Sequence, residues 1–162
     1  MSALTQLHAD IDNRVQSIRE GAAEWPCAKG CDRCCRQLAD IPTITRTEWE
    51  LLREGLSALP AEQQHEIGQR VIELAASTER PVTCPFLDRD SGACPVYPFR
   101  PVACRTYGFY VQRDRGLYCD EIESRVASGD LAYVVWGNHD AIDRSLAALG
   151  DARPLTDWFM GD

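Results

Sequence analysis

The stretch Cys27-Ala-Lys-Gly-Cys31-Asp-Arg-Cys34-Cys35 contains four cysteines within nine residues, and it is the starting point for inferring the fold of this 162-residue chain. Unrelated buried thiols pack as scattered small hydrophobes, so this density favours a shared role. On a helix or a helical turn, offsets of four, seven and eight place the thiols near one side, where three of them can converge on one centre. Four more cysteines follow singly, at Cys84, Cys94, Cys104 and Cys119.

The number of cysteines favours metal binding over disulfides. The N-terminal residues lack the basic and apolar regions of a secretory signal, so we expect a cytoplasmic protein, and disulfides are rare in that compartment. A redox-active dithiol at Cys31 and Cys34 is the other reading, but no thioredoxin-like βαβ pattern surrounds that pair. Clustered thiolates are typical ligands of zinc and of iron–sulfur clusters.

The spacing favours an iron–sulfur cluster and leaves zinc as the alternative. Structural zinc sites usually join two closely spaced pairs, whereas this chain has one Cys-x2-Cys pair followed by single cysteines. Three close cysteines and one distant cysteine are a common way to hold a [4Fe–4S] cluster. We therefore expect a [4Fe–4S] cluster as the cofactor, with zinc second.

The charge pattern excludes some partners and predicts two residues near the metal. A net charge of −8 disfavours binding to nucleic acid or to anionic lipid, and no apolar run is long enough to span a bilayer. The charge does not exclude binding to another protein. Four thiolates around Zn²⁺ or around an oxidised [4Fe–4S] core leave a charge of −2, which is costly to bury without cations. Arg100 and Arg105, next to the later cysteines, are the predicted cofactor-binding residues.

Apolar periodicity and capping signals predict an α+β fold rich in helix, a small metal-stabilised domain with helices around a cysteine-rich core of loops and short strands. The single domain, 1–162, is expected to have an N-terminal helix in 1–24, a metal-binding region in 25–119 and a helical extension in 120–162. The individual predictions are a helix over 3–19, a capping box at Thr45–Glu48 before a helix over 46–57, a helix starting at Pro60, loop and short strand over 80–110, a helix over 120–128, a buried strand over 131–136 and a final helix capped by Asn138.

The cysteine pattern resembles the YkgJ-type cysteine-cluster proteins. The resemblance rests on Cys27-x3-Cys31-x2-Cys34-Cys35, on Cys84-Pro-Phe-Leu87 and on Cys94-Pro-Val-Tyr97-Pro-Phe-Arg100-Pro101-Val-Ala-Cys104-Arg105. It implies a zinc- or iron-chelating domain whose ligand set is Cys27, Cys31, Cys34, Cys35, Cys84, Cys94 and Cys104, with Arg100, Pro101 and Arg105 in its signature. Flagellin lysine methylases are similar in this region, where the motif is associated with an iron–sulfur cluster. Cys119 lies outside the signature and is either an eighth ligand or a packed thiol.

Three functions follow as hypotheses. The first is a metal-binding protein whose iron–sulfur cluster or zinc has a structural or electron-transfer role. The second is an enzyme or enzyme subunit, a methyl or redox transferase that uses the metal centre. The third is a zinc-stapled protein-interaction module. No catalytic residue is assigned, because the chain has no P-loop, no G-x-S-x-G and no H-E-x-x-H motif.

Overall fold

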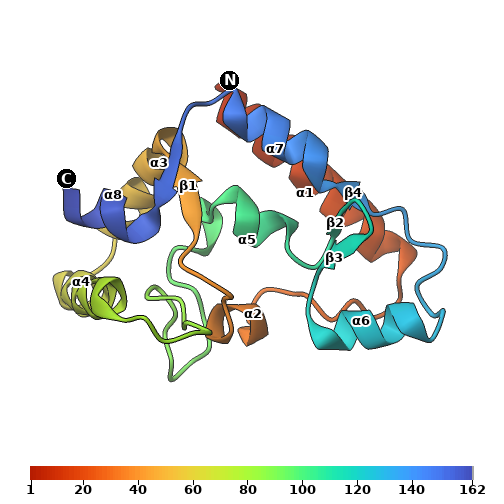
Figure 1. Cartoon of the computed structure of the whole chain (residues 1–162), viewed down its shortest axis with the longest axis horizontal. Helices are drawn as coiled ribbons and strands as arrows, with labels where there is room; N and C mark the ends of the chain where they lie inside the picture. The colour runs from red at the N-terminus through yellow and green to blue at the C-terminus, as the bar shows by residue number, and fades with distance from the viewer. Residues whose placement is uncertain (162) are drawn as a thin grey trace. The chain divides into compact units, whose positions relative to one another are not determined.

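The computed structural model describes residues 1–161 and confirms a helix-rich α+β fold (Figure 1). Short strands lie between some of the helices in chain order. The elements are α1 (Ala3–Gly21), α2 (Arg33–Arg36), β1 (Thr43–Thr45), α3 (Arg46–Ser57), α4 (Ala61–Ala76), the 3-10 helix η1 (Tyr97–Phe99), α5 (Val102–Thr106), β2 (Tyr110–Gln112), β3 (Arg115–Leu117), α6 (Asp120–Ala127), β4 (Gly137–Asn138), α7 (His139–Ala147), β5 (Ala152–Pro154) and α8 (Leu155–Gly161).

The chain forms two compact units, and each is built from two separate stretches of sequence. Unit 1 comprises Met1–Ala28 and Val102–Leu149. Unit 2 comprises Lys29–Pro101 and the stretch that begins at Gly150. The three-part division of one domain that the sequence suggests stays a prediction.

Unit 1 is built on the N-terminal helix and a small mixed sheet. The apolar stripe expected on α1 is buried, and α5 packs against this helix. The sheet has the strand order β3-β2-β4: β2 and β3 pair antiparallel with Tyr110 opposite Leu117, and β2 and β4 pair parallel with Tyr110 opposite Gly137. The buried residues of the α1 stripe are Leu4, Leu7, Ile11, Val15 and Ile18.

The strand expected over 131–136 is wrong. Leu131 is buried, but Tyr133 and Val135 are 58% and 68% exposed. The backbone there turns, with the Val134 N–H donating to the Leu131 carbonyl, and strand pairing begins only at Gly137. An apolar run of six residues fits a strand only where a neighbouring strand satisfies its backbone groups, and a local sequence pattern does not report that neighbour.

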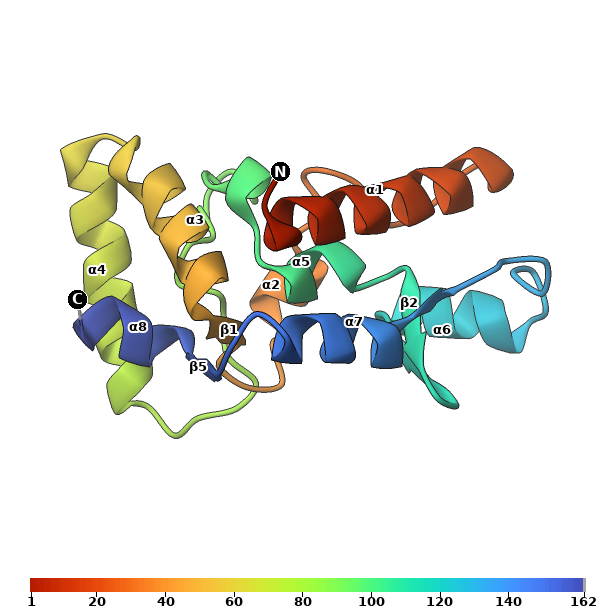
Figure 2. The same cartoon turned by 90° about the horizontal axis from the view of Figure 1, so that it is seen from above.

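Unit 2 contains the helical hairpin of α3 and α4, which Figure 2 shows side by side. The predicted capping box is present: the Thr45 hydroxyl accepts from the Glu48 N–H, and the Glu48 carboxylate accepts from the Thr45 N–H over 2.8 Å. This box fixes the first residue of α3 where the sequence predicted it.

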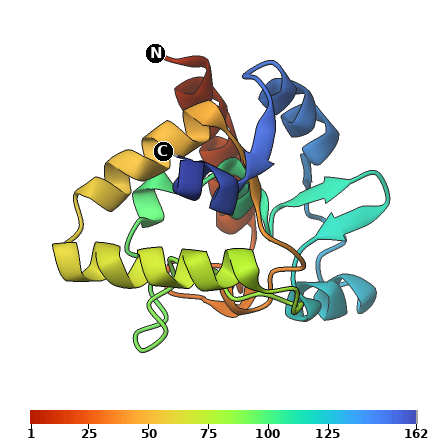
Figure 3. The same ribbon diagram turned by 60° about the vertical axis from the view of Figure 1, so that its left-hand side comes forward.

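The C-terminal segment completes the core of unit 2. Strands β1 and β5 pair antiparallel with Ile44 opposite Arg153, and α8 then packs against α3 and α4 (Figure 3). The Trp158 indole N–H donates to the Ile44 carbonyl over 2.9 Å, which holds the C-terminal segment against β1. The buried core is Ile44, Trp49, Leu52, Leu56, Ile67, Val71, Phe86, Val96, Leu155 and Trp158, and the partly buried Cys84 and Cys94 pack against it.

Gly55 is expected to stabilise the packing of η1 against α3, although glycine disfavours helix. A Cβ at this position would lie 2.5 Å from Cδ2 of Phe99, so the missing side chain lets η1 approach α3. We expect Gly55→Ala to lower the free energy of unfolding by about 1–3 kcal/mol through overpacking. Gly68→Ala in α4 is the matched control, because its Cβ would make an ordinary 3.7 Å contact with Phe159. That control should gain about 0.5–1 kcal/mol from helix propensity. Urea unfolding measures both, and equal changes of the same sign would contradict the prediction.

Candidate metal centre

The first cysteine motif is helical only at its C-terminal end. Cys34 and Cys35 lie in the single turn of α2, whereas Cys27 and Cys31 precede it in loop backbone. The helical spacing expected between Cys27 and Cys31 is wrong, because Gly30 adopts a φ of +97°, a left-handed conformation that interrupts a helix. One continuous helix therefore does not align these thiols.

Backbone hydrogen bonds join the vicinal cysteines to the segment that contains Cys84. The Cys84 N–H donates to the Cys35 carbonyl over 2.7 Å. Leu38 and Val82 form an isolated antiparallel bridge, whose two N–H···O bonds measure 2.9 and 2.8 Å. Cys84 thus lies next to the first motif, although the two are far apart in the sequence.

The turn that leads to Cys94 also contacts the first motif. The Arg36 guanidinium Nη2 donates to the Arg89 carbonyl over 3.0 Å. Gly92 has a φ of +71°, which favours glycine, and a Cβ there would lie 3.1 Å from Oδ2 of Asp32, so this turn lies close to the first motif. Three cysteine-bearing segments of unit 2 are therefore in contact, and together they carry Cys31, Cys34, Cys35, Cys84 and Cys94.

Two thiols of unit 2, those of Cys34 and Cys94, have raised pKa values. A hydrogen bond to the Cys35 thiol, followed by burial, raises the pKa of Cys34 far above its ordinary value. Burial also raises the pKa of Cys94, and the nearby charge of Arg100 opposes that shift. Because thiolate, not thiol, is the metal ligand, metal binding here must displace these protons.

The sulfurs do not form a ready-made cage. Among residues 1–161, no group of three or more His, Cys, Asp or Glu side chains is arranged to hold a metal ion. No disulfide joins any of the eight cysteines either. The structure thus brings the cysteine segments of unit 2 together, and their assignment as ligands stays a prediction.

The two signature arginines lie in different units. The Arg100 guanidinium in unit 2 stacks 3.5 Å from the centroid of the Tyr97 ring, and its Nε donates to the Tyr97 carbonyl. Lys29 Nζ lies 5.5 Å from the centroid of the same ring. In unit 1, Arg105 forms an ion pair with Asp12 of α1 over 3.1 Å. The positive charge expected beside the cysteines is thus present near Cys94, while a contact between Arg105 and a cofactor stays a prediction.

Unit 1 holds the remaining three cysteines. The Cys27 carbonyl accepts a 3.0 Å hydrogen bond from Nη2 of Arg19, and the Cys27 sulfur lies against Gly108, where a Cβ would be only 2.5 Å away. Cys104 is an exposed residue of α5. Cys119 is half-buried at the N-cap of α6.

Sequence reasoning missed two members of the aromatic group in unit 1, Trp25 and Trp136. In the sequence, Tyr107, Phe109, Tyr110 and Tyr118 lie near Cys104 and Cys119. In the structure the Trp25 ring stacks on Phe109 at 5.6 Å and meets Trp136 at 5.7 Å. Trp136 in turn contacts Tyr118 at 5.2 Å. The sequence signal that could have revealed Trp25 is the Trp25-Pro26 pair immediately before Cys27. This pair places a large aromatic ring next to the first cysteine of the motif.

The comparisons with known proteins bear on these cysteines directly. A family described as "Putative zinc- or iron-chelating domain", named CxxCxxCC, matches residues 26–125, which is more than half of the chain. The chain belongs to the CxxCxxCC family. The match includes all eight cysteines, so Cys119 lies within the CxxCxxCC region although it is outside the motif noted in the sequence.

Membership in the CxxCxxCC family makes chelation of zinc or iron the function class of this domain. This chain has three residues, not two, between the first two cysteines of the motif. No curated protein and no solved structure matches the chain. Among the helices of residues 1–161, none is both long and apolar enough to cross a bilayer.

Proposed function

We propose that the chain binds an iron–sulfur cluster, [4Fe–4S] in type, with a structural or electron-transfer role. The observation that supports this is the contact of three segments of unit 2 that together carry five cysteines. Four thiolates complete a [4Fe–4S] cluster, so this unit has enough sulfur ligands of its own. The predicted set also includes Cys27 and Cys104 of unit 1.

The donor chemistry of unit 2 fits such a group. Thiolate sulfur is the ligand that iron–sulfur clusters prefer, and four thiolates on an oxidised core leave a net charge of −2. Arg100 supplies positive charge near Cys94, and Lys29 contacts the same tyrosine ring as Arg100. We propose Arg100 as the residue that offsets the charge of the centre and, through it, tunes the affinity for metal.

Purification of the full chain without oxygen tests the proposal. We expect about four iron and four sulfide per chain, a broad brown absorbance and bleaching by dithionite. Bleaching that reverses on reoxidation supports an electron-transfer role, whereas loss of the cluster on reduction supports a structural one. Colourless protein with stoichiometric zinc would overturn the cluster and keep chelation. Protein that takes up neither metal after reconstitution would contradict both.

A further inference from the structure

The Tyr97 ring of η1 contacts a cation from each of two cysteine segments of unit 2. The Arg100 guanidinium lies 3.5 Å from the ring centroid, and Lys29 Nζ lies 5.5 Å from the same centroid. Lys29 comes two residues before Cys31 in the sequence. Arg100 comes six residues after Cys94. The ring therefore links the loop that leads to Cys31 with the segment that contains Cys94.

Packing and hydrogen bonds in the surrounding turn hold this ring in place. Val96 is part of the buried core of unit 2, and Phe99 packs against that core. The Tyr97 N–H donates to the Cys94 carbonyl over 3.1 Å. The Tyr97 carbonyl accepts from the Arg100 N–H over 3.4 Å and from the Arg100 Nε over 2.9 Å. Tyr97 is thus fixed to its neighbours on both sides, and its side chain is half-buried close to Cys94.

An aromatic ring suits this contact better than a carboxylate would. The face of the ring has a negative potential, so it attracts a cation although the side chain has no net charge. A carboxylate at the same place would attract both cations, but its own charge would add to the −2 of a centre with four thiolates. The Tyr97 ring can therefore hold Arg100 and Lys29 in position without cancelling their positive charge.

We propose that Tyr97 is a positioning residue for the metal centre of unit 2, and that its ring holds Arg100 and Lys29 where their charges offset the charge of the thiolates. This inference rests on the proposed function, because it needs a negatively charged centre at these cysteines. It goes further by giving a role to two residues outside the predicted ligand set, Tyr97 and Lys29. Loss of the ring removes a contact that holds each cation, which weakens metal binding and lowers the reduction potential of a cluster.

The test is Tyr97→Leu in the full chain, purified with its metal. The chelator concentration that removes half of the metal should fall about tenfold or more relative to the wild type. If the metal is a cluster, its reduction potential should also become more negative. Tyr97→Phe keeps the ring and should restore both values. Tyr133→Leu is the matched control, because it removes a tyrosine of unit 1 that is 58% exposed, and it should behave as the wild type does.

Lys29→Met is a second variant that leaves the core intact, because Lys29 is exposed. It should ease removal of the metal by a smaller factor than Tyr97→Leu does, since it removes one of the two cations. The double variant should lose metal no more easily than Tyr97→Leu alone, because Lys29 acts through the ring.

The outcomes separate this inference from the proposed function. Metal held as tightly by Tyr97→Leu or by Lys29→Met as by the wild type would overturn the role of Tyr97 and leave the proposed function in place. An additive loss in the double variant would do the same, because it would show that Lys29 acts independently of the ring. A wild-type chain that binds neither iron nor zinc would instead overturn the proposed function, and this inference with it.

Discussion

Cys31→Ser is expected to lose stoichiometric metal and to lower the melting temperature by more than about 10 °C. Serine offers no soft thiolate, and Cys31 belongs to the contacting segments of unit 2. The binding free energy of a structural metal is folding free energy, about 10–16 kcal/mol for zinc in small finger peptides. Because 1 kcal/mol shifts the melting temperature of a domain of this size by about 2–4 °C, even partial loss gives a large shift. Elemental analysis and calorimetry of the purified variant measure the two effects.

Cys119→Ser is the matched control for that experiment. Cys119 lies in unit 1 at the N-cap of α6, outside the signature motif and outside the three segments of unit 2 that are in contact. We expect this variant to keep its metal and to melt within a few degrees of the wild type. Metal retention to the same extent in both variants would contradict the ligand assignment, and loss in both would make Cys119 an eighth ligand.

Local signals account for the parts of the fold that the sequence predicted. The Thr45–Glu48 box fixed the start of α3 because both of its hydrogen bonds lie within four residues. The stripe on α1 was visible because one helix face repeats every three to four residues. The strand predicted over 131–136 failed for the opposite reason, since strand pairing depends on a partner that lies elsewhere in the sequence.

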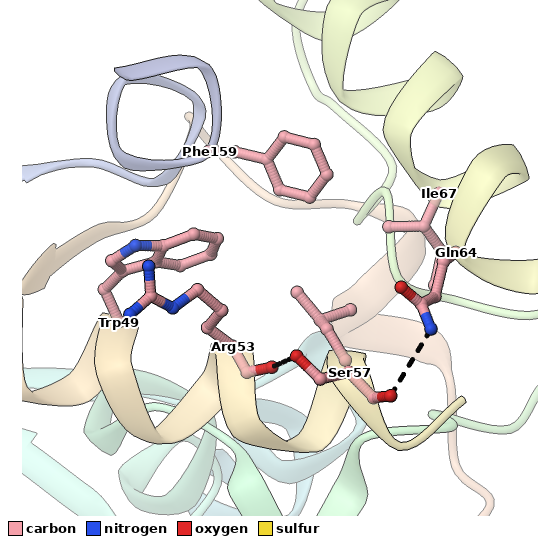
Figure 4. A pocket seen from close by; sticks show the side chains of 7 residues that line it. Trp49, Arg53, Ser57, Gln64, Ile67 and Phe159 are labelled. Atoms are coloured by element: carbon pink, nitrogen blue, oxygen red, sulfur yellow. Dashed lines mark hydrogen bonds between the residues drawn. The ribbon is translucent and has the colours of Figure 1, made fainter. Parts of the chain in front are cut away.

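The same difference between local and long-range signals applies to the candidate metal site. The sequence identified the cysteines and the arginines by residue type and spacing. It did not reveal that Cys35 and Cys84 are joined through their backbones, or that Asp32 lies against Gly92. The sequence also did not reveal the pocket between α3, α4 and α8, because Phe159, which lines it, is far from the other lining residues in the sequence (Figure 4). These features depend on long-range packing, which a single sequence does not encode in any local pattern.

Gly108→Ala is expected to destabilise the protein and to displace the first cysteine of the motif. Gly108 has a φ of +94°, and a Cβ there would lie 2.5 Å from the Cys27 sulfur and 3.3 Å from its Cβ. The left-handed backbone alone costs an alanine about 1–2 kcal/mol. Overpacking adds about 1–3 kcal/mol, because Arg19 holds the Cys27 carbonyl and the Cys27 side chain must move to relieve the contact. We therefore expect a total loss of about 2–5 kcal/mol in urea unfolding.

Gly129→Ala separates the two contributions. Gly129 also has a positive φ, +85°, but no atom lies within 4 Å of the Cβ that would be added there. It should therefore show the backbone cost alone, about 1–2 kcal/mol, with no change in the reactivity of the Cys27 thiol toward a maleimide. In Gly108→Ala that thiol should react faster than in the wild type, because the added methyl pushes it out of its present position. Equal unfolding free energies for the two variants, with unchanged labelling of Cys27, would show that the close packing of Gly108 against the sulfur does not constrain the motif.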